Sequence, residues 1–141
     1  MLEQKFEDKV RVWRDLRDKI EEDADPFNLL IRFLNTLPVS SRKTNPFDPD
    51  TQIEPWLLLD NESFTEYEIA QLCAYTLQLT DRFCGSEVEI HICKDIEKDR
   101  YVYLVYLDRS TILGYGEEAV KVQELPKNII SQKIYALPPL H

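Results

Sequence analysis

Glycine, cysteine and histidine are all scarce in this chain of 141 residues, and each shortage excludes a class of function. Three glycines leave little room for flexible linkers or for the glycine-rich loops that cradle phosphates. The three cysteines, Cys73, Cys84 and Cys93, are an odd number without C-x-x-C spacing, which indicates reduced thiols rather than a disulfide framework. With two histidines and no catalytic or cofactor motif, we predict no catalytic residues, no metal centre and no bound cofactor.

Long hydrophobic runs are missing as well. No stretch of about eighteen apolar residues occurs, which is the length that a membrane-spanning helix needs. The N-terminal segment carries charges at helical spacing instead of the apolar core of a signal peptide. We therefore predict a cytoplasmic protein that is neither secreted nor inserted in a membrane.

Basic residues are outnumbered, because 17 lysines and arginines face 26 acidic residues and give a net charge of −9. The acidic excess is spread along the chain, so we predict no general binding to nucleic acids or to anionic membranes. An acidic mimic of DNA is disfavoured for a different reason, since lysines and arginines are mixed among the carboxylates. A basic protein partner suits this charge better.

What the chain does contain is enough apolar surface for one core. Apolar residues make up 43% of the sequence, and we predict a single domain over residues 1–141. Residues 1–60 are predicted to hold two helices and an ordered connector. Apolar residues recur at steps of three and four from Leu2 to Ile20, and Asp25-Pro26 is typical of an N-cap followed by a first helical residue. We expect the second helix to stop near Pro38.

The connector from Val39 to Leu59 contains three prolines and has no regular period. We predict that Phe47, Trp56 and the leucines at positions 57–59 fix it to the core.

Residues 61–141 are predicted to form a helix and an antiparallel sheet. Ser63 and Thr65 are each followed three residues later by a glutamate, so two overlapping capping boxes predict the start of a helix that runs to Cys84. Gly85 is predicted to end this helix in a left-handed conformation.

Beyond that helix the pattern changes to period two, and Val88, Ile90 and Ile92 predict the buried face of a strand. Tyr101 to Leu107 and the segment around Ile112 predict two further strands, whereas residues 117–141 fit either strand or helix. The predicted fold class is α+β, with two to three helices packed on a small antiparallel sheet of three to five strands.

The second face of this sheet is predicted to be partly apolar. Glu89, His91 and Cys93 share one face of their strand, and antiparallel pairing places them beside apolar residues whichever way the next strand is registered. Either the N-terminal helix or another molecule must cover that apolar part. The predicted interaction surface consists of the first helix and the aromatic strand, namely Trp13, Tyr101, Tyr103 and Tyr106.

Glu89, His91 and Cys93 are also the best candidates for a thiol or metal site, because these side-chain types can ligate a transition metal or pair a thiolate with an imidazole. Alternate residues on a strand lie about 7 Å apart, which favours a solvated strand face instead. Cys73 is predicted to lie on the buried side of its helix, where burial opposes a reactive thiolate.

One part of the chain resembles known proteins. The segment PFDPDTQIEPWLLLDNESFTEYEIAQLCAYTLQLTDRF, with its Pro-Trp pair, acidic capping stretch and Tyr-Thr-Leu helix end, is similar to short uncharacterised proteins of tailed bacteriophages, as is the later TILGY. The resemblance implies a phage-related origin and assigns no activity to any residue.

The sequence therefore favours a non-enzymatic interaction or accessory module that binds a protein partner or a second copy of itself, and the resemblance implies a phage origin for it. The alternative is a small or degenerate hydrolase with the fold of cysteine proteases or transglutaminases, which would use Cys93 and His91.

Overall fold

The fold is α+β, as predicted, and the computed structural model describes residues 6–40, 47 and 55–137. Three helices of nine or more residues pack against an open antiparallel sheet of five strands. The helices are α1 (Phe6–Glu22), α2 (Pro26–Leu34), α3 (Pro55–Leu59) and α4 (Glu66–Gln78). The strands are β1 (Val88–Asp95), β2 (Arg100–Leu107), β3 (Thr111–Leu113), β4 (Val120–Lys121) and β5 (Ile129–Leu137), with a short 3-10 turn at Val122–Glu124.

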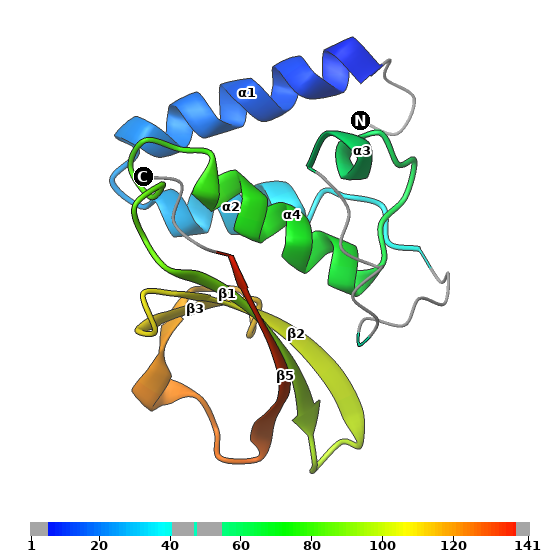
Figure 1. Ribbon diagram of the computed structural model, residues 1–141, viewed down its shortest axis with the longest axis vertical. Coiled ribbons are helices and arrows are strands. Elements are labelled where there is room, and N and C mark those ends of the chain that lie inside the picture. The colour runs from blue at the N-terminus through cyan, green and yellow to red at the C-terminus, as the bar shows by residue number, and fades with distance from the viewer. Residues whose placement is uncertain (1–5, 41–46, 48–54, 138–141) are drawn as a thin grey trace.

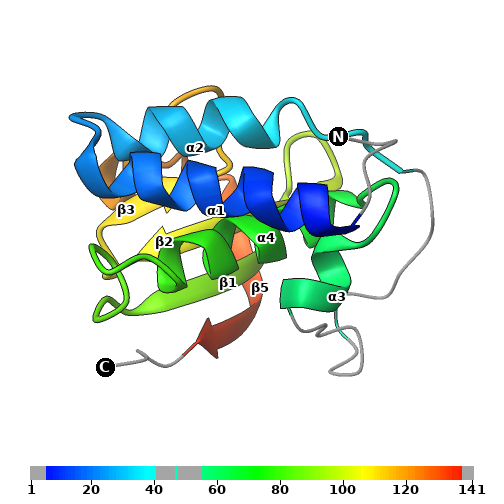
Figure 2. The same cartoon turned by 90° about the horizontal axis from the view of Figure 1, so that it is seen from above.

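The helices all lie on one side of the sheet (Figure 1). Helix α4 lies directly against β1 and β2, and α1 lies on the outer side of α4. Seen from above, α1 and α2 run side by side in opposite directions (Figure 2). This arrangement makes α4 the central helix of the molecule.

Helix α4 is buried on almost every side, because it has helices above it and the sheet below. Its N-terminus is closed by the predicted capping box, in which the Thr65 hydroxyl accepts from the Glu68 N–H and the Glu68 carboxylate accepts from the Thr65 N–H. Because Thr65 is the N-cap, Ser63 lies before the helix, and the prediction that Ser63 also caps it is wrong.

The C-terminus of α4 also differs from the prediction, since the helix ends at Gln78 and not at Cys84. The Thr80 hydroxyl donates to the carbonyl of Leu77 and accepts from the N–H of Phe83, which turns the chain away from the helix axis. Gly85 therefore does not end the helix, and the glycines that adopt positive φ are Gly114 and Gly116.

The other helix signals agree with the structure. Pro26 begins α2, and the Asp25 carboxylate accepts from the N–H of Asn28 at 3.1 Å. Within the predicted connector, Pro55 to Leu59 form the short helix α3, which the sequence did not indicate. Leu58 and Leu59 are buried as predicted, but the prediction is wrong for Leu57, which is 64% exposed. Trp56 and Phe47 are partly exposed and contact Trp13 and Tyr101 through their rings. Positions 41–46 and 48–54 lie outside the described residues.

The strand order is β4-β3-β2-β1-β5, so β1 lies between β2 and the last strand. The segment that fitted either strand or helix thus becomes β4, a 3-10 turn and the edge strand β5. Cα pairing of His91 with Leu104 shows that Val102, Leu104 and Tyr106 share the face of the polar residues of β1. We call this the second face, and the one that packs on α4 the helix face.

The second face has a small core of its own, which consists of Cys93, Leu104, Tyr106, Ile112 and Ile129. Tyr115, Val120 and Leu125 pack against this core, and all three come from the chain between β3 and β5. The apolar part of the second face is therefore covered from within the molecule. The cover is not the N-terminal helix, because α1 lies on the opposite side of the sheet.

Candidate functional site

The four residues of the predicted interaction surface do not share one surface. Trp13 is fully buried, and its indole N–H donates to the Thr76 hydroxyl at 2.8 Å. Tyr106 is buried on the second face. Tyr101 and Tyr103 point to the helix face, where Tyr101 is 44% exposed. The prediction is therefore wrong for Trp13 and Tyr106 as accessible residues, and the role of Tyr101 and Tyr103 stays a prediction.

Tyr101 and Tyr103 line a cleft of about 530 Å³ on the helix face, between α2, α4 and the β2–β3 pair. The described residues of its inner part are mostly apolar and include Ile69, Ala70 and Leu113. Gly114 closes one side, where a Cβ atom would lie 2.9 Å from the Tyr103 carbonyl oxygen and φ is +106°. Only glycine suits this close approach, so the wall of the cleft depends on it.

Polar groups surround the mouth of this cleft. Glu66 from the first turn of α4 and Arg100 from the start of β2 are both exposed, and Asn35 caps the C-terminus of α2. An apolar interior with a few polar groups around it is typical of a binding site for a ligand or a protein side chain. The sequence named its two tyrosines but gave no sign that α2 would form the opposite wall.

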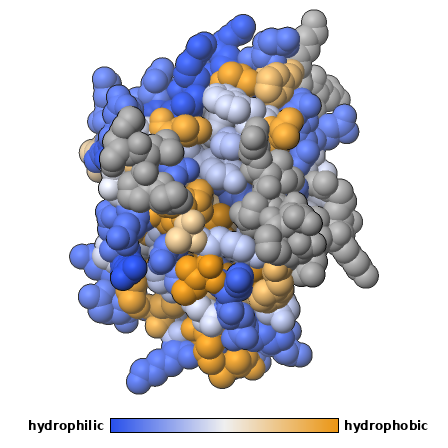
Figure 3. Space-filling view, in the orientation of Figure 1, coloured by the Kyte–Doolittle hydropathy of each residue, from blue (hydrophilic) through white to orange (hydrophobic). Residues whose placement is uncertain are grey.

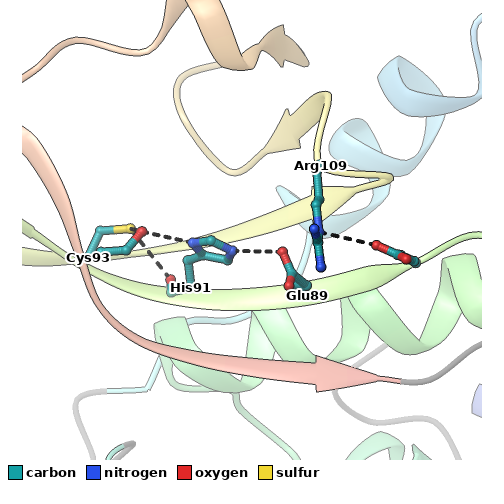
Figure 4. A network of polar contacts seen from close by, with 6 residues as sticks. Glu89, His91, Cys93 and Arg109 are labelled. Atoms are coloured by element: carbon teal, nitrogen blue, oxygen red, sulfur yellow. Dashed lines mark hydrogen bonds and ion pairs between the residues drawn. The ribbon is translucent and has the colours of Figure 1, made fainter.

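A second cluster of functional side chains lies on the second face. The imidazole of His91 contacts Glu89 through Nε2, at 3.2 Å from the carboxylate oxygen, and Ser131 through Nδ1, at 2.8 Å from the hydroxyl oxygen. The Cys93 thiol lies 3.6 Å from the same hydroxyl and also donates to the His91 carbonyl. Figure 4 shows Glu89, His91 and Cys93 in a row along β1. We call Glu89, His91 and Ser131 the relay.

The direction of the hydrogen bonds in the relay follows from chemistry. A carboxylate can only accept, so Nε2 of His91 carries the proton and Nδ1 is left to accept from the Ser131 hydroxyl. Tyr106 stacks on the imidazole with ring centroids 3.6 Å apart and 11° between the planes, which fixes the ring. Burial lowers the pKa of His91, and the bond from Glu89 opposes that shift. The imidazole is therefore kept neutral and able to take a proton.

Ser131 reaches His91 because β5 contains a bulge. Pairing with β1 shifts register between Ile92 and Cys93, where Lys133 and Ser131 are the successive partners and Gln132 is left over. In a regular ladder Gln132 would be opposite Cys93. The bulge therefore turns Ser131 to the second face, beside the imidazole.

The thiol is not suited to the role that the sequence suggested for it. Cys93 is fully buried, and burial raises its pKa, which disfavours the reactive thiolate. Within the part of the chain that the structure describes, no three histidine, cysteine or acidic side chains are grouped so that they could hold a metal ion. Burial also raises the pKa of Cys73 to about 12, so this thiol stays protonated near neutral pH.

The buried imidazole makes stability dependent on pH. The unfolded chain has the ordinary histidine pKa of 6.5, whereas burial lowers the pKa of His91 in the folded state. As the pH falls below 6.5, the unfolded state takes up a proton before the folded state does. The free energy of unfolding therefore decreases from its value above this pH until the pH has passed the lower pKa of His91 in the folded state. Glu89, Cys93 and Tyr106 are the titratable groups that face the ring.

We therefore expect the free energy of unfolding to fall between pH 7.5 and 5.5, and to fall less in His91→Gln. Urea denaturation followed by circular dichroism at several pH values measures both slopes. Equal slopes in the two proteins would contradict a neutral buried His91.

Among the described residues, no helix combines the length and the apolar character needed to cross a membrane. Compared with models of known protein families and with curated protein sequences, the chain matches none of them. The geometry of the cleft and of the relay thus carries the functional argument.

Proposed function

We propose that this chain is a protein-interaction module whose cleft between α2, α4 and β2 binds a short apolar segment of a basic protein partner. The observation that carries the proposal is the cleft itself, an apolar interior of about 530 Å³ with charged groups at its mouth. This volume is within the range of pockets that bind small ligands and side-chain clusters.

The charge of the molecule supports a basic partner. The chain has a net charge of −9, and Glu66 stands exposed at the mouth of the cleft. A lysine or arginine beside the apolar segment can pair with Glu66, and the field of the whole protein accelerates its approach. Arg100, at the β2 side of the mouth, repels such a residue and so fixes the direction in which the segment enters.

Location and origin belong to the same proposal. The proposal includes a cytoplasmic location, and a phage origin is supported by the resemblance of the region around Trp56. An accessory protein of this kind needs a partner and no catalytic activity in the cleft.

Selection of random peptides against the full chain tests the cleft. We expect the selected peptides to combine two or more apolar residues with a lysine or arginine. Their affinity, measured by fluorescence anisotropy, should drop about tenfold or more in Glu66→Lys, which corresponds to about 1.4 kcal/mol. Tyr101→Ala should weaken binding as well, because it removes an exposed aromatic wall without opening the core.

Glu7→Lys is the matched control, since Glu7 is also an exposed acidic residue in the first turn of a helix but belongs to α1, away from the cleft. It should bind as the wild type does. Unchanged affinity in both cleft variants would refute the proposed site. A doubled mass in light scattering that Tyr101→Ala abolishes would show instead that the occupant is a second copy of the chain.

A further inference from the structure

The relay on the second face has the parts of a hydrolytic site, and the cleft function does not use it. Ser131 is an exposed residue of the edge strand β5, whereas the His91 side chain behind it is only 8% exposed. A serine on an exposed edge strand, with its hydroxyl 2.8 Å from a buried and oriented imidazole, is the arrangement that activates a serine as a nucleophile.

The bulge in β5 is a second, independent observation. It leaves Gln132 unpaired with β1 and turns a serine to the imidazole in place of that glutamine. Bulges occur often beside active sites, where they redirect one side chain at the expense of a regular ladder. The irregularity thus lies at the one position of β5 that decides whether His91 has a hydroxyl partner.

We infer that Ser131 is the nucleophile of a hydrolytic site in which His91 is the general base and Glu89 is a positioning residue, acting on uncharged esters of short aliphatic acids. This site is distinct from the cleft, which lies on the other face of the sheet.

The reaction balances without any further reagent. The Ser131 oxygen attacks the acyl carbon while its proton passes to Nδ1 of His91, and the carbonyl oxygen becomes an oxyanion. Collapse of this intermediate breaks the ester bond, and the leaving alcohol takes the proton from His91. Water then attacks the acyl-serine with His91 again as base, which releases the acid and restores the hydroxyl.

Two features of β5 suit the substrate. As the edge of the described sheet, β5 has backbone N–H groups on its outer side without a partner strand, and these can donate to the oxyanion. Ile134 is the Cα partner of His91, lies on the same face and is 48% exposed. Ile134 therefore offers an apolar contact for an acyl chain, and Figure 3 shows hydrophobic side chains over the β5 side of the molecule.

Glu89 acts through the imidazole. Its carboxylate holds the proton on Nε2, so that Nδ1 faces the serine as an acceptor, and it stabilises the imidazolium that forms during the attack. Stacking on Tyr106 restricts rotation of the ring out of this position.

Covalent labelling of the full chain with an alkyl fluorophosphonate is the first test, with mass spectrometry to locate the adduct. We expect the adduct on Ser131 and its loss in Ser131→Ala. Ser110→Ala, which removes a hydroxyl from the turn between β2 and β3, should leave labelling unchanged. Labelling that persists in Ser131→Ala, or no labelling of the wild type, would overturn the proposal.

Hydrolysis of p-nitrophenyl butyrate gives the second readout. Ser131→Ala and His91→Gln should each lower kcat/KM by about 100-fold or more, the usual contribution of a serine and base acting together. Circular dichroism spectra that match the wild type would show that the variants are folded. Wild-type rates in folded Ser131→Ala would exclude the site.

Glu89→Gln separates positioning from mere structural support. Because the carboxylate raises the pKa of His91, its loss should move the rising limb of the pH profile of kcat/KM to lower pH, besides lowering the rate. A lower rate with an unmoved pH profile would contradict the role of Glu89 as the partner of the base.

Discussion

Trp13→Ala is expected to lower the free energy of unfolding by about 3–5 kcal/mol, the usual range for deleting a fully buried tryptophan side chain. Trp13 joins α1 to the central helix, because its indole N–H donates to Thr76, and its ring packs edge-to-face on Trp56 with centroids 5.2 Å apart. The substitution leaves a cavity between α1, α3 and α4 and removes the donor to a buried hydroxyl. Urea denaturation followed by circular dichroism measures the change.

Phe6→Ala is the matched control on the same helix, since Phe6 is 39% exposed. We expect this substitution to lower the free energy of unfolding by well under half as much as Trp13→Ala does. Trp13→Phe keeps most of the apolar volume and removes the indole N–H, so its loss of stability should lie between those of Phe6→Ala and Trp13→Ala. A loss below about 1 kcal/mol in Trp13→Ala would mean that α1 is not held to the core in this way.

Leu104→Ala is expected to destabilise the protein by about 2–5 kcal/mol through a different part of the structure. Leu104 is fully buried in the core of the second face, which contains few other residues that could close the cavity. The segment between β3 and β5 loses its main apolar support at the same time. Hydrogen exchange at Val120 and Leu125 should therefore accelerate more than exchange in α4.

Ile130→Ala serves as the control, because Ile130 is 43% exposed on β5, and its loss should change stability by about 0.5 kcal/mol or less. If Leu104→Ala left hydrogen exchange in the covering segment unchanged, that segment would not depend on the core beneath it.

The elements that the sequence predicted well are those with local signals. Asp25 before Pro26 and Thr65 before Glu68 satisfy N–H groups within a few residues of themselves, so their caps need no knowledge of the rest of the fold. The alternation of apolar and polar residues from Val88 to Ile92 likewise predicts the two faces of one strand. Helix α3, at five residues, is too short to show a period.

The elements that the sequence could not settle depend on distant contacts. Residues 101–107 are apolar at odd-numbered and even-numbered positions alike, so only the pairing of His91 with Leu104 shows which of them face the imidazole. The amphipathic pattern around Trp13 correctly marks one side of α1 as apolar, but it does not tell whether that side meets solvent, a partner or α4. The covering segment between β3 and β5 carried no strong periodic signal.

The candidate site was half visible in the sequence. Glu89, His91 and Cys93 were placed on one face of a strand, and the structure confirms that placement. The prediction that this face is solvated is wrong, because His91 and Cys93 are buried under the segment between β3 and β5. The spacing of about 7 Å argued against contact between them, yet the long side chains of Glu89 and His91 meet at 3.2 Å. Nothing in the sequence indicated that Ser131 would lie beside His91, because a bulge depends on how two strands pair and is not visible in the residues of one strand.

The strand order also bears on the order in which the strands pair during folding and separate during unfolding. Strands β1 and β2 are joined by a short hairpin. Pairing of β1 with β5, by contrast, brings together Val88 and Leu137, which are separated by a long stretch of chain that includes three other strands. Closing the longer loop costs more chain entropy, so we expect β5 to be the last strand to dock and, as a bulged edge, the first to leave. Because Ser131 is part of β5, we expect the relay to be lost before the hairpin and the helices unfold.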